Sequence, residues 1–235
     1  MVDQPPPASH RARQGLPRTK SAQVLVVGLG RFGSAVAIEL KQLGFEVLGV
    51  DTDARRVQKL ADDLTHVLEA DTTDPEVLAQ IGARDFDNAV VGIGSDIEAS
   101  ILTTAALADL GVPNIIAKAV TTPHGRILER VGADIVVYPE HEMGRRVAHL
   151  VGGSIIDWFQ LDANFAMVET VAPAGMLGRT LADLELRAHH GVTVVCVKPS
   201  DQGFTYATAD TVLAEGDVLE VAGPSKECEA FARLS

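Results

Sequence analysis

Hydrophobic and polar positions alternate in blocks along the first 140 residues. A Val-rich apolar run at 24–27 leads through a glycine-rich turn into apolar residues spaced as on one face of a helix, up to Leu43. Five further short apolar runs follow, separated by segments with helical spacing, at 46–50, 66–69, 88–94, 114–118 and 134–138. Strands that alternate with helices through short connections are typical of a parallel sheet covered on both faces. The pattern therefore predicts a Rossmann-like, doubly wound α/β unit that is complete by about residue 139.

The pattern changes after Pro139. Apolar residues within 143–151 and again within 155–159, interrupted by two glycines, predict a pair of helices in the segment 143–162. This segment holds Trp158 next to Phe159 and is too short to bury both side chains alone. We therefore expect the helix pair to pack on a second subunit and form a dimer. Packing against the chain's own C-terminal domain is the alternative.

The rest of the chain is rich in predicted strands, with one short helix near 180–186 and a last helix from Ser225. This pattern predicts a small α+β module, which is too small for a separate catalytic domain. The expected organisation is a basic, proline-rich disordered leader at 1–21, the α/β unit at 22–142, the helix pair at 143–162 and the α+β module at 163–235.

The glycine-rich turn carries the strongest chemical signal. Its sequence, Gly28-Leu29-Gly30-Arg31-Phe32-Gly33, has the G-x-G-x-x-G pattern between a strand and a helix. In this pattern Gly28 permits the tight turn, Gly30 lets the backbone approach a phosphate, and Gly33 lets the helix lie close to the strand. The helix N-terminus adds unpaired N–H groups and a partial positive charge. The motif predicts a nucleotide site, and a turn that serves packing alone is the alternative.

The second predicted strand ends in Asp51, at the spacing from the glycines that dinucleotide-binding folds use for the ribose. We expect this carboxylate to accept hydrogen bonds from ribose hydroxyls and to repel a 2′-phosphate, which favours NAD or an adenine nucleotide over NADP. A solvent-facing acid in a turn is the alternative.

Further contacts are expected where the other strands end, because ligands of doubly wound sheets lie beyond the carboxyl ends of the strands. In chain order the candidate contacts are Gly28, Leu29, Gly30, Arg31, Phe32, Gly33, Asp51, Thr52, Asp53, Asp71, Thr72, Ile93, Gly94, Ser95, Lys118, Ala119 and Val120.

Four titratable residues refine the expected ligand. Arg31 adds a fork-shaped cation to a loop whose backbone already serves a pyrophosphate, which favours ATP or ADP; an exposed first-turn arginine is the alternative. Lys118 either meets phosphate, which we prefer, or points to solvent. Glu140 either coordinates a cation that bridges phosphates or stabilises the first turn of a helix. His124 either reaches the nucleotide or lies in solvent on its loop.

Composition narrows the class of protein. The 235 residues carry a net charge of −12, and basic residues concentrate in the leader, so the remainder is more acidic still and nucleic acid is disfavoured as a partner. Charged residues interrupt every apolar run before it reaches membrane-spanning length, and the N-terminus has no signal-peptide pattern, so we expect a soluble, cytosolic protein. Neither the spacing of Cys196 and Cys228 nor any other motif indicates a metal site or a catalytic nucleophile.

Several phrases together make a more specific pattern than the glycine motif alone. They are residues 27–33 (VGLGRFG), 46–51 (EVLGVD), 70–73 (ADTT), 93–94 (IG), 113–115 (PNI), 132–134 (GAD), 138–140 (YPE), 177–184 (LGRTLADL), 186–187 (LR) and 191–192 (GV). With them, the chain from residue 22 onward resembles the KtrA/TrkA family. These are cytosolic subunits of bacterial potassium uptake systems built from RCK domains (regulator of conductance of potassium).

The resemblance implies an RCK N-terminal domain, a crossover helix pair that forms a dimer, and an RCK C-terminal domain. It also implies an octameric ring that lies at the inner face of the cell membrane, under a membrane potassium-translocating subunit. Exchange of ATP for ADP, or of NADH for NAD, is implied to control the shape of this ring. Carried over by position, it adds His124 and Glu140 to the nucleotide contacts and places Glu140 near the terminal phosphates, where a cation binds at the dimer interface. Relatives that bind cyclic di-AMP between paired C-terminal domains imply a second site at Leu181, Leu186 and Arg187.

The first hypothesis for the function is therefore a non-catalytic gating subunit that responds to nucleotide exchange. Its rival is an NAD-dependent oxidoreductase, for which only Lys118, His124 or Glu140 would serve as acid or base. A free-standing NAD or redox sensor for another channel is the third hypothesis and differs from the first only in its partner.

Overall fold

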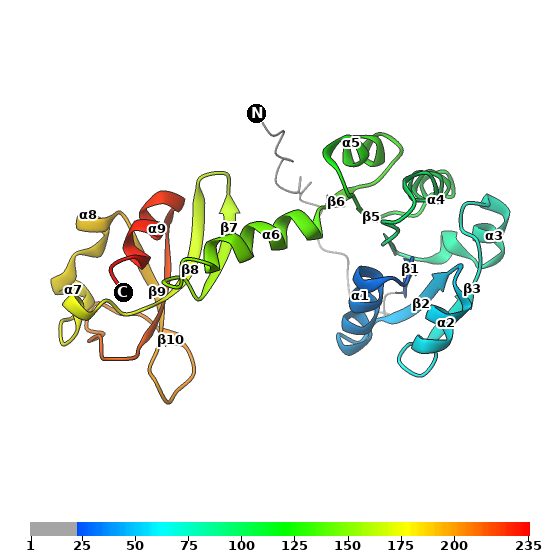
Figure 1. Cartoon of the computed structure of the whole chain (residues 1–235). Coiled ribbons are helices and arrows are strands. Elements are labelled where there is room, and N and C mark those ends of the chain that lie inside the picture. Colours follow the sequence, from blue (N-terminus) through cyan, green and yellow to red (C-terminus); the bar gives the residue numbers. More distant parts are fainter. Residues whose placement is uncertain (1–22) are drawn as a thin grey trace. The chain divides into compact units, whose positions relative to one another are not determined.

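The computed structural model describes residues 23–235, so the predicted leader lies outside the described residues. The chain divides into two compact units, one up to Glu140 and one formed by His141–Ser235, and each is described here by itself (Figure 1). No helix in the described part is long and apolar enough to cross a membrane.

The first unit is built on a six-stranded sheet in which all paired strands are parallel. The strands are β1 (Gln23–Val27), β2 (Glu46–Asp51), β3 (His66–Glu69), β4 (Asn88–Val91), β5 (Ile115–Lys118) and β6 (Ile135–Val137), in the spatial order β3-β2-β1-β4-β5-β6. The direction of winding reverses between β1 and β4, which is the point where such sheets open a crevice for a ligand. The doubly wound sheet predicted from the sequence is confirmed.

Helices cover both faces of this sheet (Figure 1). On one face lie α1 (Arg31–Gln42) and α2 (Ala54–Leu60); on the other lie α3 (Pro75–Gln80), the short η1 (Ala83–Asp85), α4 (Ile97–Asp109) and α5 (Thr122–Arg130). Alternate residues of β1 serve the two cores, Val24 and Val26 on the side of α1 and Leu25 and Val27 on the other. Each fully buried side chain of this size contributes about 1.5–3 kcal/mol, which explains why the strands are nearly continuous apolar runs.

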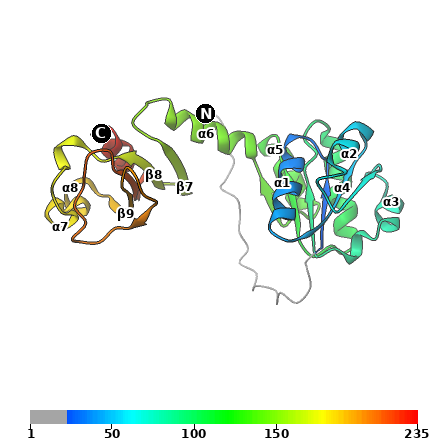
Figure 2. The same ribbon diagram turned by 90° about the horizontal axis from the view of Figure 1, so that it is seen from below.

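The second unit contains a five-stranded antiparallel sheet with the order β10-β9-β11-β8-β7. Its elements are most of α6 (Pro139–Leu150), then β7 (Asp157–Asp162), β8 (Phe165–Val171), η2 (Ala174–Met176), α7 (Leu181–Leu184), α8 (Leu186–His190), β9 (Thr193–Lys198), β10 (Thr205–Tyr206), β11 (Val218–Pro224) and α9 (Ser225–Ala232). Helix α9 packs on β8 and β11 and buries Cys228 and Phe231 in the core. Figure 2 shows the ribbon of this unit from a second direction.

The predicted pair of helices at 143–162 is wrong in its second half. The first helix exists as α6, but the residues that follow Gly152-Gly153 form strand β7. There Trp158 lies opposite Val168 and is 3% exposed, whereas the next residue, Phe159, points to the other side and is 41% exposed. This alternation is the period of a strand, in which neighbouring side chains point to opposite faces.

The single tryptophan packs within its own unit, which was the alternative considered from the sequence. Trp158 belongs to the core cluster of the C-terminal unit, and its ring stacks on His149 with 3.7 Å between ring centroids. Burial of Trp158 therefore needs no second subunit.

Candidate nucleotide site

The carboxyl ends of the parallel strands open on a cavity of about 980 Å³. Most of the contacts predicted from the sequence line it: Gly28, Leu29, Gly30, Arg31, Phe32, Asp51, Thr52, Asp71, Thr72, Ile93, Gly94, Ser95, Lys118, Val120 and Glu140. Four of the predicted contacts do not line the cavity: Gly33, Asp53, Ala119 and His124. The structure thus brings residues that end or follow all six strands of the sheet to one place.

The three glycines of the loop have different surroundings. Gly28 has φ +84°, a left-handed conformation that suits glycine, and a Cβ on Gly33 would lie 1.9 Å from the carbonyl oxygen of Gly28. The close approach of α1 to the loop therefore requires glycine at position 33. A Cβ on Gly30 would meet nothing within 4 Å and would occupy open space at the cavity wall. That space is what a phosphate approaching the backbone would need.

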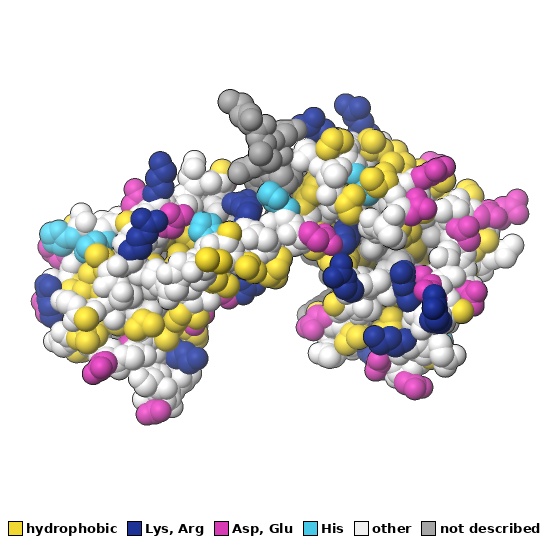
Figure 3. Space-filling model, in the orientation of Figure 1, with side chains coloured by type: hydrophobic (Ala, Val, Ile, Leu, Met, Phe, Trp, Pro, Cys, Tyr) yellow, Lys and Arg dark blue, Asp and Glu magenta, His cyan; other side chains and the backbone are white. Residues whose placement is uncertain are grey.

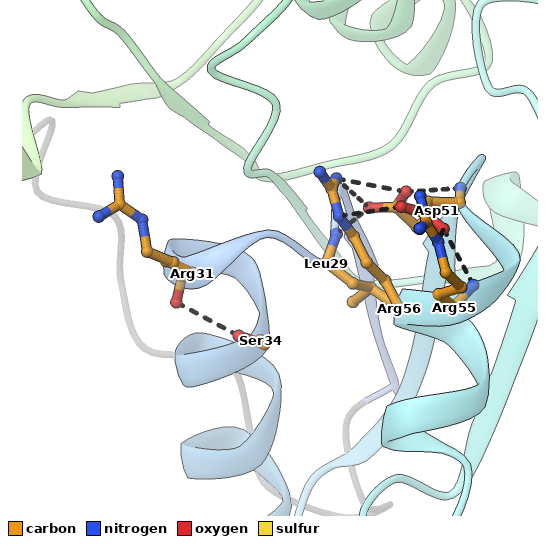
Figure 4. Close-up of polar contacts among 7 residues, drawn as sticks. Leu29, Arg31, Ser34, Asp51, Arg55 and Arg56 are labelled. Atoms are coloured by element: carbon orange, nitrogen blue, oxygen red, sulfur yellow. Dashed lines mark hydrogen bonds and ion pairs between the residues drawn. The ribbon is translucent and has the colours of Figure 1, made fainter.

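One end of the cavity has the features of an anion site. Gly30 is the N-cap of α1, no side chain caps this helix end, and no acidic residue lies in its first turn. The N-terminus of α1 therefore keeps its partial positive charge. The Arg31 side chain extends away from the cluster around Asp51 (Figure 4), and within the described residues no hydrogen bond or ion pair holds its guanidinium.

At the opposite end lies Asp51, which is only 5% exposed, so a solvent-facing acid is wrong. Its Oδ2 accepts a hydrogen bond from the backbone N–H of Leu29 at 2.6 Å, and its Oδ1 accepts one from the N–H of Asp53 at 2.8 Å. Arg56 Nη1 lies 3.2 Å from Oδ2 and 3.5 Å from Oδ1 (Figure 4). The carboxylate thus ties the glycine-rich loop to the start of α2.

Arg56 was not recognised in the sequence analysis, although it lines the cavity and contacts the carboxylate assigned to the ribose. It lies five residues after Asp51, in the first turn of α2. That spacing from a strand-terminal acid is the signal that would have identified it. Lys59 and Asp63 also line the cavity near α2, as do Glu98 and Leu102 of α4.

Lys118 and Glu140 form an ion pair at the cavity wall, with Lys118 Nζ 2.5 Å from Glu140 Oε1. Lys118 is 8% exposed, so a lysine that points freely to solvent is wrong. The hydrogen bond from Lys118 is the main reason that the pKa of Glu140 lies below its ordinary value; Arg31 adds a smaller attraction. No group of three or more His, Cys, Asp or Glu side chains that could hold a metal ion occurs among residues 23–235, so Glu140 belongs to no such group within the described part of one chain.

His124 lies behind the cavity wall and is 2% exposed, so a solvated loop histidine is wrong. Its Nδ1 accepts a hydrogen bond from the N–H of Val120 at 3.4 Å, and burial lowers the pKa of the imidazole. Since Val120 lines the cavity and His124 does not, the structure gives His124 a supporting contact with the wall rather than a direct contact with a ligand.

A second, smaller cavity of about 440 Å³ lies in the C-terminal unit beside α7 and α8. The three residues predicted for a second effector site, Leu181, Leu186 and Arg187, all line it. Both Nε and Nη2 of Arg187 donate to Thr193 Oγ1, at 3.1 and 3.0 Å.

A doubly wound parallel sheet with a glycine-rich loop after its first strand and a buried acid after its second defines a Rossmann-type domain, here joined to a small α+β module. The TrkA-N domain family matches residues 24–139, and the TrkA-C domain family matches residues 165–235.

Two relatives place the chain within a single family. It is 38% identical over 207 residues to the Ktr system potassium uptake protein C of Bacillus subtilis (strain 168), covering 88% of this chain and 94% of that protein. It is 35% identical over 208 residues to the Ktr system potassium uptake protein A of Vibrio alginolyticus, with the same coverage of 88% and 94%. The chain belongs to the KtrA/TrkA family of potassium uptake proteins, and the resemblance seen in the sequence is confirmed.

Two solved structures support the fold assignment. The GsuK RCK domain superposes with a TM-score of 0.63 at 19% identity, covering 95% of this chain and 50% of that one. The GsuK channel bound to NAD gives the same TM-score at 19% identity, over 93% of this chain and 40% of the channel chain. At this identity the likeness establishes the shared RCK fold.

Proposed function

We propose that this protein is a non-catalytic, nucleotide-binding regulatory subunit of a potassium uptake system. Nucleotide exchange, chiefly ATP for ADP, would change the geometry of an assembly of RCK dimers, and the assembly would control a membrane potassium-translocating subunit. The protein would work in the cytoplasm, at the inner face of the membrane through its partner. NAD and NADH are the second ligand class to test, because the same loop and acid serve dinucleotides.

One observation carries this proposal: the cavity has a cationic end and an acidic end, each built from residue types that suit one part of a nucleotide. Gly30, Arg31 and the N-terminus of α1 lie at the first end and would hold phosphate, and Asp51 lies at the other and would hold the ribose. The volume of about 980 Å³ accommodates a nucleotide, since ligand pockets commonly measure roughly 300–1,000 Å³.

Regulation requires that the two nucleotides make different contacts, because a ligand shifts an equilibrium only by its differential affinity for the two states. Arg31, which lines the cavity and forms no ion pair within the described residues, is the simplest source of that difference. A fork-shaped guanidinium near the end of a phosphate chain would hold the γ-phosphate that ADP lacks.

The test is the ratio of ATP affinity to ADP affinity in Arg31→Ala. We expect this ratio to fall by about tenfold, the value of one charge-assisted contact. Arg55→Gln, which removes a 92% exposed guanidinium that does not line the cavity, is the matched control and should keep the ratio of the unmodified protein. An unchanged ratio in Arg31→Ala would show that another residue senses the third phosphate.

We assign the dimer contact to α6, whose outward side is apolar. Met143 and Val147 are 52% and 49% exposed, Val151 just after the helix is 82% exposed, and none of the α6 residues is buried. Figure 3 places hydrophobic side chains along this helix. Association of these faces in pairs, and of pairs in an octameric ring, would remove the apolar surface from water. This dimer contact is tested by measuring the molar mass of Val147→Lys and of the unmodified protein by light scattering. We expect the variant to have the lower mass, because its pairs dissociate.

Two finer ligand assignments belong to the same proposal. Glu140 would contribute to a cation site completed by nucleotide phosphates and a second subunit, since one carboxylate alone is too few ligands. The C-terminal cavity would take an effector of the cyclic di-AMP class, with Arg187 facing a phosphate. Loss of cyclic di-AMP binding in Arg187→Ala, with ATP binding retained, is the expected result.

A further inference from the structure

The carboxylate of Asp51 has no hydrogen-bonding capacity to spare. Its two oxygens already receive the N–H groups of Leu29 and Asp53 and both contacts from Arg56 Nη1 (Figure 4). A carboxylate offers about four lone-pair positions, so these four contacts use what it has. A ribose hydroxyl that donates to Asp51 must therefore replace one of them.

Of the present donors, Arg56 is the one able to leave. The N–H of Leu29 is fixed by the glycine-rich turn, and the N–H of Asp53 is fixed at the start of α2. The Arg56 side chain is 47% exposed and has another carboxylate within reach, with its Nε 3.8 Å from Asp53 Oδ2. It is a long, flexible group whose charged head can move into water without leaving a buried group unpaired.

From this geometry we propose that Arg56 is a specificity-determining residue that competes with the 2′-hydroxyl of the bound nucleotide for Asp51. The inference rests on the proposed function, because it takes the Asp51 end of the cavity as the ribose end. While Arg56 holds Asp51, each ribose contact is made at the expense of an ion pair. Arg56 therefore weakens the discrimination between ribose and 2′-deoxyribose that Asp51 alone would provide.

The contact with Arg56 also weakens the repulsion of a ribose 2′-phosphate that the sequence predicts for Asp51. Asp51 is 4% exposed in its side chain, whereas Arg56 presents a half-exposed positive charge at that end of the cavity. The charge that an incoming ligand meets first is thus the guanidinium of Arg56.

The test compares ADP with 2′-deoxy-ADP by calorimetry. Both ligands carry the same phosphates, so the loss of a positive charge near the phosphates cancels in the ratio of their affinities. In Arg56→Gln we expect the preference for ADP over 2′-deoxy-ADP to rise about two- to fivefold, the range that a partly exposed ion pair supports. Arg55→Gln removes the neighbouring charge, which contacts Asp53 and not Asp51, and should leave the preference unchanged.

A second measurement needs no variant and covers the case in which Arg56→Gln does not fold. Raising the salt from about 0.05 M to about 0.5 M screens the half-exposed pair, so the preference of the unmodified protein for ADP should increase. A preference that stays constant or falls in Arg56→Gln, or that does not respond to salt, overturns the inference, and a fall would mean that Arg56 itself binds the hydroxyl. Absence of binding by both ligands would instead refute the proposed function, and the inference with it.

Discussion

Both units bring acidic residues together on a β-sheet, but in the parallel sheet they meet at the strand ends around a cavity, whereas in the antiparallel sheet they lie side by side within the strands. In the N-terminal unit Asp51 and Lys118 end their strands, border one cavity and have ionic partners, Arg56 and Glu140. In the C-terminal unit three acids lie opposite one another on three adjacent antiparallel strands, with Asp157 at the start of β7. Asp157 is opposite Glu169 on β7 and β8, and Glu169 is opposite Glu220 on β8 and β11.

The difference follows from strand direction. Parallel strands end at the same edge of the sheet, so polar residues that follow apolar runs meet there and can surround a ligand. Antiparallel strands end at alternate edges, and polar residues within them share a face without enclosing a space. Asp157 is paired with Arg146, but Glu220 has a buried oxygen, Oε1, without a hydrogen-bond partner in the described part of the chain. Burial, and then repulsion from Glu169 and Asp157, raises the pKa of Glu220.

The substitution Gly33→Ala is expected to have the largest effect, and to lower the stability of the N-terminal unit alone. The added Cβ would lie 1.9 Å from the carbonyl oxygen of Gly28, and a clash with backbone cannot be relieved by a side-chain rotation. We expect the N-terminal unit to lose about 3 kcal/mol of stability. Hydrogen exchange should accelerate in β1 and α1 and stay unchanged in β8 and β11.

Gly30→Ala is the control for that variant, since its Cβ would meet nothing within 4 Å and its φ of −65° suits any residue. Its stability should change by less than about 0.5 kcal/mol. Nucleotide binding should nevertheless weaken, because the Cβ enters the space assigned to phosphate. Equal destabilisation by the two substitutions would contradict this account of the loop.

An intermediate effect is expected from the ion pair at the cavity wall. Glu140→Gln leaves the buried Lys118 ammonium without its partner and should destabilise the N-terminal unit by roughly 1–2 kcal/mol. Lys118→Met should cost less, because the Glu140 side chain is 61% exposed and can be hydrated. ADP should raise the melting temperature of Glu140→Gln more than that of the unmodified protein, since a phosphate would replace the missing carboxylate. Equal ADP-induced shifts would argue that Lys118 does not meet phosphate.

The smallest change in stability is expected for substitution of Glu220 in the C-terminal unit. A carboxyl group whose pKa is raised by folding favours the folded state at low pH, and that contribution is lost as the pH rises through the folded-state pKa. Glu220→Gln should therefore raise the melting temperature by a few degrees at pH 7 and have little effect near pH 4. Glu169→Gln, on the neighbouring strand, should act in the same direction because it removes part of the repulsion. Stabilisation of Glu220→Gln that is the same at both pH values would exclude this electrostatic cause.

The N-terminal unit could be predicted from the sequence because its strands are buried on both faces and appear as continuous apolar runs. Strand β7 could not, because apolar residues at 155, 156, 158 and 159 fit one face of a helix as well as a strand. Pairing with β8, which places Trp158 in the core, decides between the two. Lys118 and Glu140 were both named from the sequence, but their contact joins residues 22 positions apart and depends on the fold. Arg56 was missed because its signal, a position five residues after a strand-terminal acid and in the first turn of the next helix, was not considered.

The central claim is that an adenine nucleotide binds with its phosphates at the glycine-rich loop and its ribose at Asp51. Isothermal titration calorimetry of the unmodified protein with ATP and ADP, repeated on Gly30→Ala, tests it most directly. The account predicts saturable binding of both nucleotides at one site per chain and much weaker binding of both to Gly30→Ala. Absence of binding heat with either nucleotide on well-folded protein, or equal affinity in Gly30→Ala, would contradict it.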